Sequence, residues 1–525
     1  MARTYVELVE DDESLRPEED RRPGIVDVVR RNPVRSLVAA AAVLALVAAA
    51  LVGQLVVDAR ERARLARLSD LPGVLRPVDL PLRTLVATEG DVAGAMQYGV
   101  PVGRTLVAGS YSPVLADPEV MAVDRSTGEV VWQVAVGLPP ATEPAPDVET
   151  QNDASSNVWC SAVDEPAVDG SGDDAEHARV ACTVSRSYGW RLREDGSGSE
   201  VAVRGLVVLD ATDGAVVSRH DEELGAEIFT AGDGYWVTTL DDDQRGVTVV
   251  ARTYDGDERW TTHIDVPGSV PPGITPFVAH DDRRTVLGVG TRAWVLGPDG
   301  STVATIGSGS GDGGLSLVPG GVLIQSYGAV GGRPGAGVLW RDDGTQVDLG
   351  GDEPFWFSLD DGSRPDAFFT VSGGTGPLVR RDEDGDEMWH ADVMVGSSAV
   401  LLDGTAVVAG GDQLAAVDVD TGDVRWRTTM PMPVDQFFTD GRVLLGVNGR
   451  TVRAYGADDG VLRWTARLVE HEDGTAVLDR TATDDPSAPG AGPTDGLDDG
   501  WWTVTSDDRL AYSDSTETAR VFVLG

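Results

Sequence analysis

The chain has 525 residues, 41% of them hydrophobic, so it is long enough to bury a substantial core. It carries 86 acidic and 42 basic residues, which gives a formal net charge of −44 at pH 7. A surface this acidic repels phosphate backbones, and we therefore expect no nucleic-acid partner.

Residues 1–35 form a polar segment of mixed charge. Runs such as EDDES and PEED offer too little hydrophobic surface to build a core, so we expect a disordered cytoplasmic tail. The segment is also far too short to hold an enzyme domain.

Residues 36–57 contain no charged side chain over 22 positions, which is long enough to cross a bilayer as a helix. We predict a single transmembrane helix here; the alternative is a helix buried in a protein core. Five arginines lie shortly before the segment, between residues 21 and 35, and four lie shortly after it, between residues 60 and 67, so the positive-inside rule hardly separates the two orientations. We expect residues 58–81 to continue the helix for a few turns and then to form a proline-containing linker.

Residues 82–525 contain eight copies of one pattern, a short apolar run followed by Asp-Gly or Thr-Gly. In five copies a Trp follows four positions after the glycine. The glycines are Gly128, Gly214, Gly256, Gly300, Gly344, Gly385, Gly422 and Gly460, and the tryptophans are Trp132, Trp260, Trp389, Trp426 and Trp464. Apart from the first interval, the spacings between glycines run from 37 to 44 residues, a period typical of one four-stranded propeller blade.

Each copy has the features of a β-hairpin. Glycine accepts a positive φ, and a preceding Asp caps its own backbone, so the pair favours a tight turn. The apolar run before the turn then forms one strand. The Trp lies on the returning strand, where a large buried ring can lock one blade to the next. An ordinary meander sheet is the alternative, but the regular period disfavours it.

The repeat count predicts an all-β propeller of eight blades, with seven also possible. A degenerate hairpin at residues 500–524 follows the eight clear copies, so we expect the first and last pieces of the domain to share a closing blade. Pairing of the chain ends would remove exposed sheet edges. The 86-residue interval between Gly128 and Gly214 holds either a degenerate blade or an insertion, of which we favour the insertion.

Two polar insertions interrupt the repeats, at residues 139–176 and 470–499, and both are rich in Pro and acidic side chains. Cys160 and Cys182 lie 22 positions apart around the end of the first insertion. An isolated pair in an all-β domain beside a membrane anchor indicates a disulfide bond outside the cytoplasm. Two free buried thiols are the alternative.

The units AVDRSTGEVVW, AVDVDTGDVRW and AYGADDGVLRW resemble the PQQ-like propeller repeat, and the resemblance covers residues 104–525. That family includes quinoprotein dehydrogenases, an outer-membrane assembly lipoprotein of Gram-negative bacteria, and sensor ectodomains of some actinobacterial receptor kinases. The resemblance implies a propeller. Quinoprotein dehydrogenases also carry an adjacent Cys-Cys pair and acidic plus Asn calcium ligands, and the lack of both in this chain argues against a bound quinone. Arginine as the only basic residue type is typical of an actinobacterial chain.

We predict no catalytic, cofactor-binding or metal-binding residues. The six histidines are scattered singly over different units and form no HExxH or HxH pair. The Asp-rich runs at residues 382–386 and 418–423 invite a calcium interpretation. They lack the distal Glu of an EF-hand loop and coincide with the repeat turn, so turn chemistry explains them.

These observations favour a membrane-tethered scaffold that binds an unknown protein or cell-envelope ligand. We expect a single-pass cell-membrane protein with its N-terminus in the cytoplasm and its propeller outside. The two acidic insertions are candidate recognition loops for a basic partner, although they could simply be solvated loops. The alternative function is a quinoprotein-like oxidoreductase or another propeller enzyme.

Overall fold

The computed structural model describes residues 33–69, 71–112, 117–139, 155–163, 178–192, 198–480 and 500–525, with short gaps inside the last two ranges. The chain divides into two compact units, Met1–Arg67 and Leu68–Gly525. Of the tail predicted at residues 1–35, the structure describes only residues 33–35.

The first unit contains nearly all of helix α2 (Pro33–Leu68), which has 36 residues. This helix includes residues 36–57, and it has one basic side chain, Arg67, in its last turn. In the described part of the chain, none of the helices combines the length and the apolar character that crossing a membrane requires.

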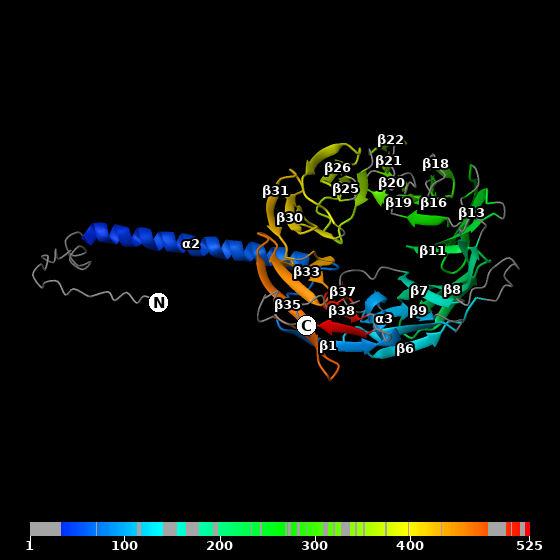
Figure 1. Ribbon diagram of the computed structural model, residues 1–525, viewed down its shortest axis with the longest axis horizontal. Coiled ribbons are helices and arrows are strands. Elements are labelled where there is room, and N and C mark those ends of the chain that lie inside the picture. The colour runs from blue at the N-terminus through cyan, green and yellow to red at the C-terminus, as the bar shows by residue number, and fades with distance from the viewer. Residues whose placement is uncertain are drawn as a thin grey trace, which may run out of the picture. The chain divides into compact units, whose positions relative to one another are not determined.

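The second unit is built from antiparallel meanders that follow one another in chain order around a ring, which is the architecture of a β-propeller (Figure 1). The first strand of a meander lies toward the middle of the ring, as β11 (Glu227–Ala231) and β19 (Gly313–Val318) show in Figure 1. The all-β propeller fold expected from the repeats is confirmed.

The first four meanders come from residues 100–306. The first contains β2 (Val100–Val102), β3 (Thr105–Gly109), β5 (Glu119–Asp124) and β6 (Val130–Ala135). The second contains β4 (Tyr111–Ser112), β7 (Ser155–Ala162), β8 (Arg179–Leu192), β9 (Gly198–Asp210) and β10 (Val216–Asp221). The third contains β11 (Glu227–Ala231), β12 (Gly234–Leu240), β13 (Gly246–Thr253) and β14 (Glu258–Asp265). The fourth contains β15 (Phe277–His280), β16 (Thr285–Val289), β17 (Arg292–Leu296) and β18 (Thr302–Ile306).

The next four meanders come from residues 313–470. The fifth contains β19 (Gly313–Val318), β20 (Gly321–Ser326), β21 (Gly337–Arg341) and β22 (Gln346–Asp348). The sixth contains β23 (Asp352–Phe355), β25 (Ala367–Ser372), β26 (Leu378–Asp382) and β27 (Glu387–Ala391). The seventh contains β28 (Ala399–Leu402), β29 (Thr405–Gly410), β30 (Gln413–Asp418) and β31 (Val424–Thr429), with the short strand β24 (Leu359–Asp360) parallel to β28. The eighth contains β32 (Gln436–Thr439), β33 (Val443–Asn448), β34 (Thr451–Gly456) and β35 (Leu462–Glu470).

The position of each strand in the ring explains its sequence. The third strand of a meander is covered on both faces by neighbouring meanders, so it reads as a continuous apolar run; Leu414–Val417 in β30 are all buried. The fourth strand lies at the outer edge and alternates, as in β31, where exposed and half-buried residues alternate from Arg425 onward and none is fully buried. Each of the eight repeat glycines lies in the turn between the last two strands of a different meander.

The two ends of the second unit close the ring. Strand β1 (Leu82–Glu89) pairs antiparallel with β39 (Arg520–Leu524), which continues into β38 (Leu510–Asp514) and β37 (Trp501–Val504). We call these four strands the closing meander. The short strand β36 (Ala476–Arg480) pairs with both β35 and β1, so the eighth meander and the closing meander form one nine-stranded sheet.

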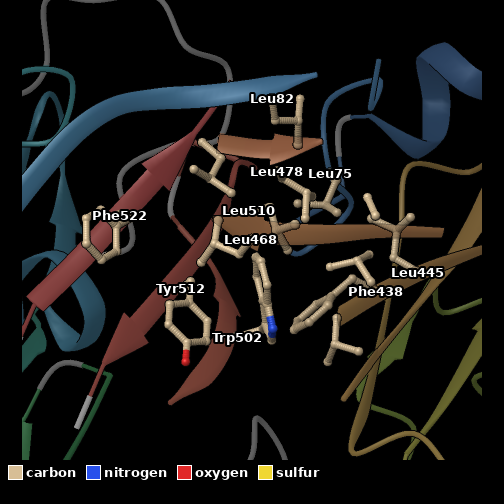
Figure 2. Packing of buried hydrophobic residues seen from close by; sticks show 14 of the residues in the cluster. Leu75, Leu82, Phe438, Leu445, Leu468, Leu478, Trp502, Leu510, Tyr512 and Phe522 are labelled. Atoms are coloured by element: carbon tan, nitrogen blue, oxygen red, sulfur yellow. The ribbon is translucent and has the colours of Figure 1, made fainter. Parts of the chain in front are cut away.

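The closing meander packs on both of its neighbours. One buried cluster joins Tyr512 and Phe522 to Phe438 and Leu445 of the eighth meander (Figure 2). A second cluster joins Val521 and Val523 to the first meander and to helix α3 (Gly90–Tyr98), which buries Ala93, Ala95 and Met96. The predicted pairing of the chain ends is therefore present, but the first repeat keeps a sheet of its own and does not share the closing meander.

Residues 71–81, interpreted from their prolines as a linker, are part of the packed unit. The backbone N–H of Leu75 donates to the carbonyl of Thr439 at 2.8 Å, and that of Arg76 donates to the carbonyl of Asp508 at 2.8 Å. The Leu75 side chain is fully buried beside Leu478 and Leu445 (Figure 2). This segment lies across the junction between the eighth meander and the closing meander and fills part of its core.

Candidate functional site

The junctions between consecutive meanders are where the repeated residues meet. A repeat glycine lies directly under the Trp ring of the preceding meander. A Cβ placed on Gly214 would lie 2.6 Å from Cε3 of Trp132, and one on Gly422 would lie 2.8 Å from Cδ2 of Trp389. The pairs Trp260–Gly300 and Trp426–Gly460 are equally close. The glycine is therefore required twice, by its positive φ and by the aromatic ring above it.

Three of these tryptophans also form a hydrogen bond across the junction. The indole N–H donates to the second residue of the next repeat turn, in the pairs Trp132 to Ala211 O (2.9 Å), Trp389 to Val419 O (2.9 Å) and Trp426 to Ala457 O (3.2 Å). Each pair combines a large, half-buried ring with one satisfied indole donor, which holds neighbouring meanders together.

The repeat turns have two lengths. In five-residue turns the glycine N–H donates to the carbonyl four residues back, as in Gly214 to Asp210 and Gly422 to Asp418. In four-residue turns the bond spans three residues, as in Gly300 to Gly297 and Gly256 to Thr253. All three docked indoles meet five-residue turns. Trp260 meets a four-residue turn, and in the described residues its N–H makes no such bond.

The remaining repeat residues have different neighbours. Gly128 lies against Val86 and Thr88 of β1, and Gly385 against Leu339 and Val347. No atom lies within 4 Å of a Cβ placed on Gly344, counting the described residues. Trp464 packs against the buried cluster between the eighth meander and the closing meander. The sequence thus identified the turn glycines, but not which of them face a tryptophan.

The disulfide predicted between Cys160 and Cys182 is confirmed. The two residues are directly opposite on the paired strands β7 and β8, with their Cα atoms 4.0 Å apart. Both side chains are buried in the cluster between the first and second meanders, beside Val158 and Val184. The bond therefore ties the two central strands of the meander that carries the first insertion.

Strand β10 carries Ser218, His220 and, just after it, Glu222, an alternation that places all three on one face. The arrangement superficially resembles a hydrolase triad. The Ser218 hydroxyl instead donates to the carbonyl of Tyr254 at 2.8 Å, and Nε2 of His220 lies 3.2 Å from the same carbonyl. Ser218 stands where other copies have Trp, so its hydroxyl takes over the bond across the junction.

Glu222 forms a partly buried ion pair with Arg252 of β13. Burial raises the pKa of the Glu222 carboxyl, and the neighbouring Arg252 opposes this rise. Burial likewise raises the pKa of the nearby Tyr235 hydroxyl, whose ring stacks on His220 at 5.9 Å between centroids. This is a dense cluster of titratable groups, but its serine and carboxylate are both engaged in junction contacts. Sequence reasoning missed it because its members come from different repeats.

The Asp-rich runs act as turn caps. Asp418 accepts hydrogen bonds from the backbone N–H groups of Asp420 and Thr421 and from the Arg425 guanidinium. The Arg425 hydrogen bond holds the pKa of the Asp418 carboxyl below its usual value. In the described residues, no group of three or more His, Cys, Asp or Glu side chains is arranged to hold a metal ion.

Among the residues whose side chains the structure describes, three tryptophans outside the repeat pattern are exposed. Trp159 of β7, Trp356 after β23 and Trp501 of β37 are 65%, 52% and 39% exposed. Strands β23 and β37 form one edge of their sheets, and β7 is next to the edge strand β4. This is the edge that lies toward the middle of the ring in Figure 1. Large exposed aromatics on rigid strands are typical of binding surfaces.

Most of the two insertions lies outside the described residues. Of the first, the structure describes residue 139 and residues 155–163, which include part of β7. Of the second, it describes residues 470–480, where β36 pairs with β35 and β1. The acidic parts named as candidate recognition loops, residues 140–154, 164–177 and 481–499, are not described.

Comparison with known proteins gives one family match. The model of the family described as outer membrane protein assembly factor BamB matches residues 375–518. No match was found among curated proteins.

Several solved structures are similar to this chain. BamB from Moraxella catarrhalis is 16% identical, with a TM-score of 0.33 over 76% of this chain and 100% of that chain. A europium-containing methanol dehydrogenase is 10% identical, with a TM-score of 0.35 over 86% and 91%. Apo AztD from Citrobacter koseri is 11% identical, with a TM-score of 0.32 over 59% and 86%. The strand topology, rather than these similarities, defines the fold.

Proposed function

We propose that the propeller is a binding scaffold that presents the inner edges of its sheets to a protein or cell-envelope partner. The observation that carries the proposal is the set of exposed tryptophans, Trp159, Trp356 and Trp501, on or beside inner strands. Trp rings left in water on a rigid framework supply the large contact area on which binding hot spots depend. The match of residues 375–518 to a family named for an assembly factor supports this class of function.

The ring provides the rigidity that a scaffold needs. Its meanders are joined by buried apolar clusters and by indole hydrogen bonds, and a disulfide ties two paired strands within the second meander. Because the docking strands are fixed before a partner arrives, little conformational entropy is lost on binding. The net charge of −44 further favours a basic partner and an association rate that falls with added salt.

The test is quantitative cross-linking on cells with matched variants. Trp159→Ser and Trp356→Ser, alone and together, should reduce partner capture severalfold, since each removes exposed ring area without touching the core. Val303→Ser is the control, because Val303 is also highly exposed, at 66%, but belongs to the outer strand β18. Equal capture by all variants would remove the inner edges from the proposal.

The alternative, a quinoprotein-like oxidoreductase, is tested separately. Pyrroloquinoline quinone with calcium should support no reduction of an artificial electron acceptor by alcohols or sugars. The motivating observation is that the two cysteines are bonded across β7 and β8 rather than adjacent in sequence. Quinone-dependent turnover would contradict the scaffold proposal and support the oxidoreductase alternative.

We also propose that residues 36–57 tether the propeller to the membrane, with the N-terminus in the cytoplasm. The uncharged 22-residue run and the disulfide support this topology. Protease added to intact wall-stripped cells should digest the chain after residue 70 or so and spare the tail. Protection of the propeller would contradict the topology.

The blade number is a further part of the proposal. The closing meander packs on the first and eighth meanders through separate clusters, so we count it as a blade beside the eight that carry repeat glycines. The sequence favoured eight because it counted the first repeat and the final hairpin as one shared blade. An experimental structure in which β1 joins the sheet of β2 would restore the smaller number.

A further inference from the structure

A short segment before β1, residues 71–78, crosses the junction at which the ring closes, and we call it the strap. Its sequence, LPGVLRPV, has two prolines and a glycine. Within the described residues, its strand pairing is limited to a parallel bridge from Val74 to Thr439. A segment with so little regular structure of its own depends for its order on the groups that it contacts.

The strap lies across the ends of the first strands of two neighbouring meanders. Val74 is buried in one cluster with Leu402, the last residue of β28 in the seventh meander. The Leu75 N–H donates at 2.8 Å to the carbonyl of Thr439, the last residue of β32 in the eighth meander. The strap therefore ties the seventh meander to the eighth.

The strap reaches the closing meander through the turn between β37 and β38. The Asp508 carbonyl accepts the Arg76 N–H at 2.8 Å, and the Asp508 carboxylate accepts the Gly73 N–H. The Leu75 side chain belongs to the same buried cluster as Trp502 of β37 (Figure 2). The strap thus holds both the backbone and the core side of this hairpin.

A buried carboxylate fastens the far end of the strap. Asp440, 8% exposed, follows β32, and its Oδ1 accepts the N–H groups of Arg442 and Val443, both at 2.9 Å. Its Oδ2 accepts the Val78 N–H at 3.1 Å. One oxygen therefore shapes the local turn, and the other binds the strap. Hydrogen bonds to an ionised acceptor are stronger than those to a neutral one.

The closing meander lacks a connection that the other meanders have. In each of the eight repeat meanders, the turn with the repeat glycine joins the last two strands. In the closing meander these strands are β39 and β1, which lie more than 400 positions apart in sequence. Pairing strands that no short turn joins costs more loop-closure entropy, so the contacts that hold the start of β1 carry more weight here.

We propose that the strap is a latch for ring closure, so that the strap and the closing meander become ordered together or not at all. Trp501 belongs to β37, and its fixed position therefore depends on the latch. Release of the strap would disorder this part of the inner edges and leave Trp159 of the second meander in place. The effect on docking rests on the proposed scaffold function, whereas the latch itself does not.

The test is hydrogen–deuterium exchange of the purified full-length protein, measured by mass spectrometry on peptides from the strap, the closing meander and the third meander. Asp440→Asn is nearly isosteric and keeps one oxygen for the local turn, but it places an NH₂ group against the Val78 N–H. Val74→Ser removes the anchor on the seventh meander. Neither substitution changes a residue of the closing meander.

Each variant has a matched control. Asp473→Asn makes the same change in a turn of the same nine-stranded sheet, where the carboxylate caps its own turn at Thr475. Val395→Ser matches Val74→Ser, because both valines are 1% exposed and Val395 is buried between the sixth and seventh meanders.

We expect Asp440→Asn and Val74→Ser each to speed exchange about tenfold in the strap, the change typical of losing one buried contact. Exchange in the closing meander should rise by the same factor, because a cooperative unit opens as a whole. The third meander should keep its rate, and the controls should leave the closing meander unchanged. Faster exchange in the strap alone, or a uniform rise over all meanders, would overturn the latch.

Cross-linking on cells tests the effect on docking. In the Asp440→Asn variant, partner capture at Trp501 should fall relative to capture at Trp159. Equal capture at both would overturn the link between the latch and the docking surface. The absence of any partner would contradict the scaffold proposal instead, and the exchange measurement would still decide whether the strap is a latch.

Discussion

At the scale of single residues, one position in a turn decides what a neighbouring tryptophan can do. Five-residue turns such as Asp210–Gly214 offer their second carbonyl to an indole. The four-residue turn Gly297–Gly300 does not, and the four-residue turn Thr253–Gly256 offers its second carbonyl to the hydroxyl of Ser218. Both kinds place the terminal glycine beneath an aromatic ring where one is present. The repeat thus preserves ring-on-glycine packing while the hydrogen bond varies.

This difference predicts unequal effects of the same substitution. Trp426→Phe loses ring volume and leaves the Ala457 carbonyl without its indole donor, whereas Trp260→Phe loses ring volume alone. We expect the free energy of unfolding to fall by about 1 kcal/mol more for Trp426→Phe. Urea unfolding of the two variants measures this difference directly. Equal losses would show that the indole hydrogen bond contributes nothing at the junction.

The turn aspartates predict a dependence of stability on pH. The Arg425 hydrogen bond lowers the pKa of Asp418 in the folded state. A lowered folded pKa stabilises the fold above the unfolded pKa, near 4, and this contribution is lost as the pH falls through the folded value.

Arg425→Gln should therefore cost at most a few tenths of a kcal/mol at pH 7, because the pair is largely exposed. The cost should shrink toward zero in acid. Denaturant unfolding of both proteins between pH 7 and pH 3 gives the comparison. A cost that stays constant over this range would argue against an electrostatic origin.

The sequence correctly identified those residues whose type is required by the local backbone conformation. Positions 214 and 422 require glycine because their φ is positive. The sequence of a single repeat is enough to reveal this requirement. The junction partners were not predictable, because they lie one repeat apart. Ser218 shows the limit well: it occupies a Trp slot by position, but only the fold shows that its side chain and that of His220 both meet the Tyr254 carbonyl.

At the scale of elements, the sequence predicted the disulfide correctly, but it did not predict that the proline-containing segment is packed. The bond between β7 and β8 was predictable because only two cysteines exist. Residues 71–81 resembled a linker because prolines break regular structure, and nothing in their sequence reveals that Leu75 is buried. Burial there depends on the distant strands β32 and β38.

Removal of the disulfide should destabilise the propeller. The bond closes a loop of 22 residues, for which the loss of loop entropy in the unfolded chain is worth about 3 kcal/mol. The double variant Cys160→Ala, Cys182→Ala should lower the unfolding midpoint accordingly. Protein taken from its native compartment should show no free thiol after denaturation without reductant. Two free thiols would contradict both the bond and the extracytoplasmic location.

Leu75 should be a core residue in spite of its place before the repeats. Leu75→Ala is expected to cost about 2–5 kcal/mol of unfolding free energy, the usual range for a fully buried leucine. Leu85→Ala serves as control, because Leu85 lies in β1 but is half exposed. A Leu75 variant as stable as the control would mean that the segment is the linker that its prolines indicate.

At the scale of the whole molecule, closure depends on residues more than 400 positions apart in sequence, in β1 and β39. The repeats predicted the propeller because their period is local. They could not predict which strand completes the closing meander, since β1 carries no repeat glycine. The exposed tryptophans were not predictable either, because they depend on which strand edges the closed ring leaves uncovered.

The central claim is that the inner edges of the sheets form the docking surface of a scaffold. It is tested most directly by mapping, on intact cells, the peptides of the propeller that become cross-linked to a partner. The account predicts cross-links concentrated around Trp159, Trp356 and Trp501 and weakened by added salt. Cross-links confined to outer strands such as β18 and β31, or no partner at all, would contradict it.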